Sequence, residues 1–206
     1  MWKTILDLIF PINCLGCGQP GDFICFNCFE KIPLNTEPPL NNLLIVSYYQ
    51  SPLIKQLIHR YKYDFVKSLV RPLGTLMAKK LTQQNIKDLI LVPIPLHPKR
   101  LRWRGFNQAQ ELSLVISKKL NIPIINNLLI RKKHTLPQAK IDNLKQRRVN
   151  IKDSFQINSS FKDNLKNKNI ILIDDISTTG ATIEECTKIL KSLKPKAVYG
   201  LVIAKG

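Results

Sequence analysis

The sequence has 206 residues, which suits one ordinary domain with a small appendage. Hydrophobic residues make up 44% and charged residues 22% of the chain, which argues against a disordered or collagen-like protein. No apolar run reaches the roughly 18 residues that a membrane-spanning helix needs. Thirty-two Lys and Arg against 14 Asp and Glu give a net charge of +18, which predicts an anionic partner: nucleic acid, a phosphorylated metabolite or an acidic membrane surface.

The positive charge is unevenly distributed. Residues 1–40 carry two Lys and four acidic residues, a net charge of −2, so the remaining 166 residues carry +20. Residues 97–152 alone hold 14 Lys and Arg against two acidic residues, a net charge of +12. This difference in electrostatic character suggests two functional units.

The N-terminal ten residues briefly resemble a signal peptide, but Asp7 interrupts the apolar stretch and no small-residue cleavage site follows. The apolar residues instead fall on one helical face, which favours a short helix docked on the core over a membrane-surface anchor. These residues are Ile5, Leu6, Ile9 and Phe10. The absence of an export signal predicts a cytoplasmic protein, in which clustered cysteines are more often metal ligands than disulfides.

Four cysteines form two C-x2-C pairs separated by seven residues, at Cys14, Cys17, Cys25 and Cys28. Each pair can direct two thiolates at one point, and four thiolates complete the tetrahedral shell of a structural Zn²⁺ site. A redox pair or two coincidental pairs are the alternatives, but no βαβ pattern surrounds the motif as a redox pair would require. We predict a zinc unit over residues 1–35, too small to fold on a hydrophobic core alone.

Residues 33–42 contain three prolines and no periodic pattern, which predicts a linker. Beyond it, strands and helices alternate over residues 43–206, which predicts an α/β domain around a parallel sheet. The expected strands are Leu43–Tyr49, Leu89–Val92, Ile124–Ile130, Ile170–Ile173 and Ala197–Ala204. The expected helices begin at Ser51-Pro52 and span Leu69–Leu81, residues 107–120 and Thr182–Leu193, and residues 162–169 read as a solvated loop.

The most informative segment is the apolar strand Ile170–Ile173, followed by Asp174 and Asp175, a hydroxyl-rich turn with Gly180, and a helix. Ligands of open α/β sheets bind beyond the carboxyl ends of strands, and the free N–H groups of a helix N-terminus favour an anion. We therefore predict a site for a phosphate monoester. The paired acids beside it suit neutral hydroxyl donors or a hydrated Mg²⁺. A two-acid Mg²⁺ site of the response-regulator or NTPase type is the competing interpretation, which the hydroxyl-rich continuation disfavours.

A second candidate site is the basic segment that follows the strand ending at Pro93. Residues 99–104 contain four cations, which is more than a solvent-exposed surface needs. Such a cluster of cations suits the binding of pyrophosphate. Lys99, Arg100 and Arg104 are the best candidates, whereas Trp103 either stacks on a base or is buried. A further basic stretch, residues 131–150, lacks an apolar pattern and is predicted to be a mobile loop.

The sequence Asp-Asp-Ile-Ser-Thr-Thr-Gly-Ala-Thr resembles the phosphoribosyl pyrophosphate (PRPP) motif of type I phosphoribosyltransferases. The resemblance implies that Asp174 and Asp175 hold the ribose 2′- and 3′-hydroxyls. It also implies that the loop holds the 5′-phosphate, through Ser177, Thr178, Thr179, Gly180, Ala181 and Thr182. In an active enzyme of this kind, an acceptor displaces pyrophosphate from C1′ with the help of Mg²⁺. Asp174, Asp175 and Arg104 are the residues expected to act in that step.

Several motifs accompany the cysteine pairs: Pro-Ile-Pro-Leu-His-Pro-Lys-Arg with Arg-Gly-Phe-Asn-Gln-Ala, and later Thr-Leu-Pro-Gln-Ala with Arg-Arg-Val-Asn. In these motifs most of the chain resembles the ComF competence-protein family. The resemblance implies a zinc ribbon joined to a type I phosphoribosyltransferase-like domain, and a role in uptake of single-stranded DNA beside a helicase partner. It also implies that residues 131–150 close over PRPP. The alternatives are a PRPP-dependent transferase of nucleotide metabolism without a DNA role, and an adaptor that docks a helicase through its zinc unit.

Overall fold

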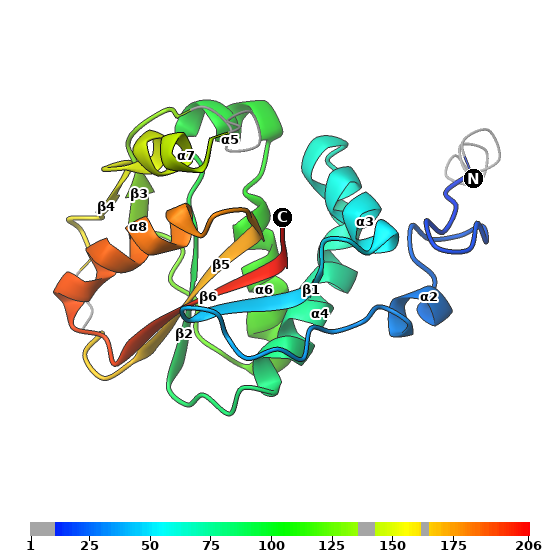
Figure 1. The fold of residues 1–206 in the computed structure, drawn as a ribbon, viewed down its shortest axis with the longest axis horizontal. Coiled ribbons are helices and arrows are strands. Elements are labelled where there is room, and N and C mark those ends of the chain that lie inside the picture. Colours follow the sequence, from blue (N-terminus) through cyan, green and yellow to red (C-terminus); the bar gives the residue numbers. More distant parts are fainter. Residues whose placement is uncertain (1–10, 136–142, 162–164) are drawn as a thin grey trace.

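The computed structural model describes residues 11–135, 143–161 and 165–206 (Figure 1). The helix predicted over residues 5–10 lies outside the described residues, as does part of the solvated loop predicted at 162–169. No helix in the described ranges is long and apolar enough to cross a membrane.

A parallel sheet of four strands forms the centre of the molecule, in the order β1-β6-β5-β2. The strands are β1 (Leu43–Tyr48), β2 (Leu89–Pro93), β5 (Asn169–Ser177) and β6 (Ala197–Lys205). Their register places Val92 opposite Leu172 and Ile173 opposite Leu201. The predicted α/β class and four of the five predicted strands are therefore confirmed.

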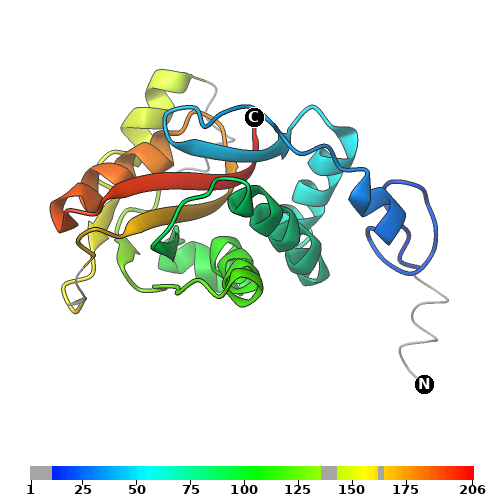
Figure 2. The same cartoon turned by 90° about the horizontal axis from the view of Figure 1, so that it is seen from below.

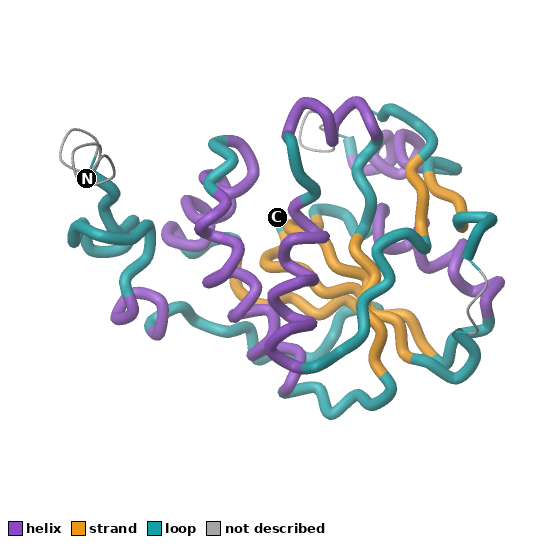
Figure 3. The backbone as a smooth tube through the Cα atoms, turned by 180° about the vertical axis from the view of Figure 1, so that it is seen from behind, coloured by secondary structure: helices purple, strands orange, loops and turns teal. Residues whose placement is uncertain are grey.

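The helices cover both faces of this sheet (Figure 2). On one face lie α3 (Pro52–Tyr63), α4 (Val70–Thr82) and α6 (Gln108–Leu120), the last shown crossing the strands in Figure 3. On the other face lies α8 (Ala181–Leu190), packed against α7 (Leu144–Ile151). A short 3-10 turn, Lys67–Leu69, precedes α4, and another, Lys191–Leu193, follows α8.

Alternation along β5 divides the core between the two faces, as expected when successive strand residues point to opposite sides. Ile171 and Ile173 join the apolar cluster under α3, α4 and α6. Ile170 and Leu172 join the cluster under α8. All four are fully buried, which explains why the strand is apolar at every position.

The strand predicted over Ile124–Ile130 is largely wrong. Ile124 makes an isolated parallel bridge to Leu91, after which Asn126 and Asn127 form a turn. Only β3 (Leu129–Arg131) follows, and it pairs antiparallel with β4 (Phe155–Ile157) in a separate two-stranded sheet.

Two basic segments are helical where no helix was predicted. The helix α5 (Pro98–Arg104) begins at Pro98, is capped by His97, whose Nδ1 accepts from the Lys99 N–H at 3.2 Å, and ends at Gly105 with φ 75°. The second helix, α7, occupies part of the stretch predicted to be a loop, because it has no apolar face that periodicity could reveal.

Residues 33–42 lack helices and strands, but they are tied to the sheet and to α4. The Asn35 N–H donates to the Val46 carbonyl at 2.8 Å, and the Ser47 hydroxyl donates to the Pro33 carbonyl at 2.6 Å. The buried Lys80 ammonium also donates to the Asn35 carbonyl. Upstream, the short helix α2 (Phe26–Glu30) carries Glu30, whose carboxylate lies 2.9 Å from Lys79 on α4.

Candidate functional site

The predicted phosphate loop lies where β5 passes into α8. Gly180 adopts φ 81°, a left-handed conformation that glycine reaches without steric cost, and it directly precedes the helix. The Gly180 N–H donates to the Ser177 hydroxyl at 3.1 Å, and the Ala181 N–H donates to the Thr179 hydroxyl at 3.3 Å. The loop is thus closed by its own hydroxyls at the start of a ten-residue helix, where the helix dipole favours an anion.

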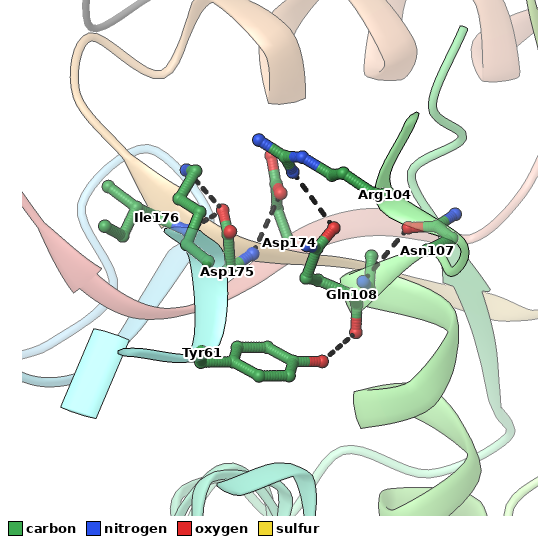
Figure 4. Close-up of polar contacts among 9 residues, drawn as sticks. Tyr61, Arg104, Asn107, Gln108, Asp174, Asp175 and Ile176 are labelled. Carbon is green, nitrogen blue, oxygen red and sulfur yellow. Dashed lines mark hydrogen bonds and ion pairs between the residues drawn. The ribbon is translucent and has the colours of Figure 1, made fainter. Parts of the chain in front are cut away.

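The two acids lie side by side at the end of β5 and accept hydrogen bonds from the following backbone (Figure 4). Asp174 Oδ1 accepts from the Asp175 N–H at 2.8 Å, and Asp175 Oδ1 accepts from the Ile176 N–H at 2.7 Å. Asp175 is buried and Asp174 is half-buried. Burial, together with the neighbouring Asp175 carboxylate, raises the pKa of Asp174 to about 7.

The acid pair has a cationic partner that the sequence did not reveal. Lys62, near the end of α3, places its Nζ 3.0 Å from Asp175 Oδ1. Burial alone would raise the pKa of Asp175, but the Lys62 ammonium, together with the charge of Arg104 and the hydrogen bond from the Ile176 N–H, holds the pKa below its ordinary value. The two residues are 113 positions apart, so no local motif could have joined them.

The predicted pyrophosphate residues lie on α5, opposite the acids. The Arg104 Nη1 donates to Gln108 Oε1 at 3.0 Å, whereas its buried Nε has no hydrogen-bond partner among the described residues (Figure 4). The Arg100 Nη2 donates to the Thr135 carbonyl at 2.9 Å. Lys99 is exposed and lines the same cavity.

Arg131, at the end of β3, is a further cation of the site that sequence reasoning did not single out. Its guanidinium is buried, donates from Nη2 to the Thr135 hydroxyl at 2.6 Å and lies 5.3 Å from the centre of the Phe155 ring. Burial lowers the pKa of Arg131 to about 10, and the charge of Arg100 adds to this effect. Thr135 therefore receives donors from both arginines, which links β3 to α5.

One cavity of about 840 Å³ brings these groups together. Its described lining contains the acid pair, the phosphate loop and seven Lys or Arg side chains, namely Lys55, Lys62, Lys99, Arg100, Arg104, Arg131 and Arg147. All the predicted PRPP-site residues from Lys99 to Thr182 line this cavity. Trp103 lies at its edge and is 68% exposed, so the alternative that this ring is buried is wrong.

The four N-terminal cysteines form a separate cluster. Their Sγ atoms all lie within 4.8 Å of one another, close to the spacing of about 3.8 Å that Zn–S bonds of 2.3 Å impose on a tetrahedron. The Cys14 sulfur accepts from the N–H groups of Cys25 at 3.3 Å and Gly16 at 3.4 Å. Burial opposes ionisation, yet these hydrogen bonds lower the pKa of Cys14 to about 6. The cluster therefore fits a tetrahedral Zn²⁺ ion, whose four thiolate ligands would be these cysteines.

Comparison with known proteins agrees with this fold and site. A family model described as the phosphoribosyl transferase domain matches residues 105–205, which begin directly after α5 and include the phosphate loop and the acid pair. The chain therefore contains a phosphoribosyltransferase-type domain of α/β architecture, with a four-cysteine cluster near its N-terminus.

The relatives identify the family more narrowly. Competence protein F of Haemophilus influenzae is 34% identical over 206 residues, covering 95% of this chain and 86% of the relative. DNA utilization protein YhgH of Escherichia coli is 27% identical over 186 residues, covering 86% of this chain and 77% of the relative. Competence protein ComFC of Bacillus subtilis is 26% identical over 197 residues, covering 91% of this chain and 73% of the relative. The chain belongs to the competence protein F family.

Proposed function

We propose that this chain binds PRPP in the cavity between α5 and the β5–α8 loop and supports the uptake of single-stranded DNA in natural transformation. The observation that supports PRPP binding is that three chemically distinct sets of groups line one cavity. A hydroxyl- and N–H-rich loop suits the 5′-phosphate, paired carboxylates suit ribose hydroxyls, and guanidinium groups suit pyrophosphate.

In this arrangement the loop from Ser177 to Thr182 holds the 5′-phosphate, because it leads into the N-terminus of α8, where the helix dipole favours an anion, and its hydroxyl-bearing residues line the cavity. Asp174 and Asp175 accept hydrogen bonds from the ribose hydroxyls. Lys99, Arg100 and Arg104, which all line the cavity, then face the pyrophosphate. Mg²⁺ bound with PRPP would neutralise part of the charge on its phosphates.

The same geometry would serve a transferase. Displacement at C1′ forms a bond to the acceptor and breaks the bond to pyrophosphate, and Arg104 would stabilise the negative charge of that leaving group. Asp174 and Asp175 would hold the ribose in place during the substitution. A PRPP-dependent transferase of nucleotide metabolism without a DNA role is the alternative function, and the intact phosphate loop and acid pair favour it equally.

The DNA role is supported by charge and by the names of the relatives, which include competence and DNA utilization proteins. PRPP needs only a few of the 32 Lys and Arg residues, so it leaves most of the net charge of +18 unexplained, and DNA phosphates are an anionic partner that would account for it. Trp103 exposes its ring beside Arg104, whose guanidinium carbon lies 6.0 Å from the ring centre. Aromatic rings between cations are the usual platforms for unpaired bases.

The zinc unit is proposed to dock a helicase of the uptake machinery. Phe26, in α2 between the ligand pair Cys25 and Cys28, is 76% exposed, so a large apolar side chain faces outward from the cysteine cluster. Replacing Phe26 by Ser in the full chain should weaken the helicase complex without changing PRPP affinity. Unchanged complex formation by that variant would count against the docking role.

Paired titrations separate the two activities of the main proposal. Wild type and Asp174→Asn/Asp175→Asn are titrated first with PRPP and Mg²⁺ by calorimetry and then with labelled single-stranded DNA at several salt concentrations. The proposal expects the variant to lose PRPP binding and to keep DNA binding that weakens steeply with salt. Loss of neither activity would refute the PRPP site, and salt-independent or absent DNA binding by wild type would refute the DNA role.

A further inference from the structure

The acid pair has a resident counter-ion in this protein. Lys62 reaches from α3 to within 3.0 Å of Asp175 Oδ1, and the Lys62 side chain is 21% exposed while that of Asp175 is 6% exposed. A charge pair withdrawn from water to this degree is screened little by solvent and is costly to separate. The ammonium is therefore a fixed part of the site.

The hydrogen bonds of the two carboxylates leave one oxygen of each for a ligand. The Oδ1 atom of Asp175 accepts hydrogen bonds from both the Lys62 ammonium and the Ile176 N–H. The Oδ1 atom of Asp174 accepts a hydrogen bond from the Asp175 N–H. Among the described residues, both Oδ2 atoms therefore remain as acceptors on neighbouring residues, a pair that matches two adjacent hydroxyl groups of a sugar.

The charges around the pair disfavour a metal ion at the same place. Even above pH 7, where Asp174 is ionised as well as Asp175, the two carboxylates and the Lys62 ammonium carry a net charge of only −1. A pair of carboxylates without this ammonium would offer two negative charges to Mg²⁺. Arg104 and Arg131 add to the positive potential, since their charges lower the pKa values of Asp175 and Asp174, respectively. Cations therefore face the pair from α3, α5 and β3.

We propose that Lys62 is a positioning residue that keeps the acid pair open to the ribose hydroxyls and closed to a divalent cation. The ribose half of this inference rests on the proposed PRPP site. Its consequence is that Mg²⁺ enters the cavity on the pyrophosphate of PRPP and is not held by Asp174 and Asp175 beforehand. Lys62 thus distinguishes a sugar-binding carboxylate pair from a two-carboxylate metal site.

Mn²⁺ binding in the absence of PRPP tests this inference, because the spin resonance signal of free Mn²⁺ disappears when the ion is bound. The full chain is first given one equivalent of Zn²⁺ to occupy the cysteines. We expect Lys62→Met to bind Mn²⁺ at least tenfold more tightly than wild type, and Lys62→Met/Asp174→Asn to lose that gain. Lys62→Arg, which keeps the charge, should bind Mn²⁺ as weakly as wild type.

Arg60→Met is the matched control, because Arg60 lies on the same helix but pairs with the exposed Asp64 at 3.0 Å. It removes one cation from α3 without touching the acid pair and should leave Mn²⁺ binding at the wild-type level. Lys62→Gln provides a second neutral variant, and circular dichroism verifies that each variant is folded.

Equal Mn²⁺ affinity of wild type, Lys62→Met and Lys62→Gln would overturn the inference. That result is expected if the Lys62–Asp175 ion pair only holds α3 against β5, because removing it would then change stability but not Mn²⁺ binding. Tight Mn²⁺ binding by wild type that depends on Asp174 would overturn it as well. Failure of wild type to bind PRPP is a different outcome: it refutes the proposed function and leaves the exclusion of Mn²⁺ by Lys62 standing.

Discussion

Asp174→Asn should stabilise the protein at alkaline pH relative to wild type. Burial and the charge of Asp175 raise the pKa of Asp174 from 3.8 to about 7 in the folded state. An acid with a raised pKa contributes its full stability below pH 4 and loses it as pH rises through 7, because the folded protein must then bury an ionised carboxylate.

The size of the effect follows from linkage. Between pH 5 and pH 8, a shift of this size lowers the unfolding free energy of wild type by up to about 2.5 kcal/mol. Asp174 is only half-buried, so screening by solvent reduces the expected loss to about 1 kcal/mol. Asn has no charge to bury, so the advantage of the variant should grow by this amount from pH 5 to pH 8.

Urea unfolding of wild type and Asp174→Asn at pH 5, 6, 7 and 8 measures this difference directly. Asp64→Asn is the matched control, since Asp64 forms an exposed ion pair with Arg60 that contributes little. A stability difference between Asp174→Asn and wild type that stays constant across this pH range would refute the assignment of a raised pKa to Asp174.

Three further outcomes are expected. Cys17→Ser leaves three thiolates and should lower the zinc retained after gel filtration well below one equivalent, as measured with a colorimetric chelator; full retention would contradict the four-cysteine site. Gly180→Ala should weaken PRPP binding about fivefold in calorimetry, because adopting the left-handed conformation of Gly180 costs alanine about 1 kcal/mol. Unchanged affinity would argue against a role of this loop in PRPP binding. Gly74→Ala on α4 should lower the unfolding free energy, measured in urea, by about 1–3 kcal/mol, because the added Cβ would lie 2.7 Å from Val115 on α6. Equal or higher stability of this variant would show that α4 and α6 can move apart at little cost.

The sequence predicted best what is encoded within one continuous segment. The apolar run at 170–173, the acids, the hydroxyl-rich turn and the following helix are adjacent along the chain, so strand, loop and helix could be expected together, and β5 and α8 confirm them. The cysteine cluster is a similar case, because two C-x2-C pairs separated by seven residues can converge without help from the rest of the fold.

Features that depend on distant contacts could not be read from the sequence. Lys62 meets Asp175 across 113 positions, and only the packing of α3 beside the carboxyl end of β5 brings them together. Arg131 and Arg100 converge on Thr135 because the small β3–β4 sheet holds that segment against α5. The strand β3 itself was misplaced, since the apolar run before it is interrupted by a turn that periodicity does not detect.

The central claim is that the cavity between α5 and the β5–α8 loop binds a phosphoribosyl ligand. Calorimetric titration of the wild-type chain with PRPP and Mg²⁺, repeated in the presence of excess ribose 5-phosphate, tests it most directly. The account predicts saturable binding of one PRPP per chain that ribose 5-phosphate weakens by competition, because the phosphate loop and the acid pair recognise the part that both ligands share. Absence of binding at millimolar PRPP, or binding that ribose 5-phosphate leaves unchanged, would contradict it.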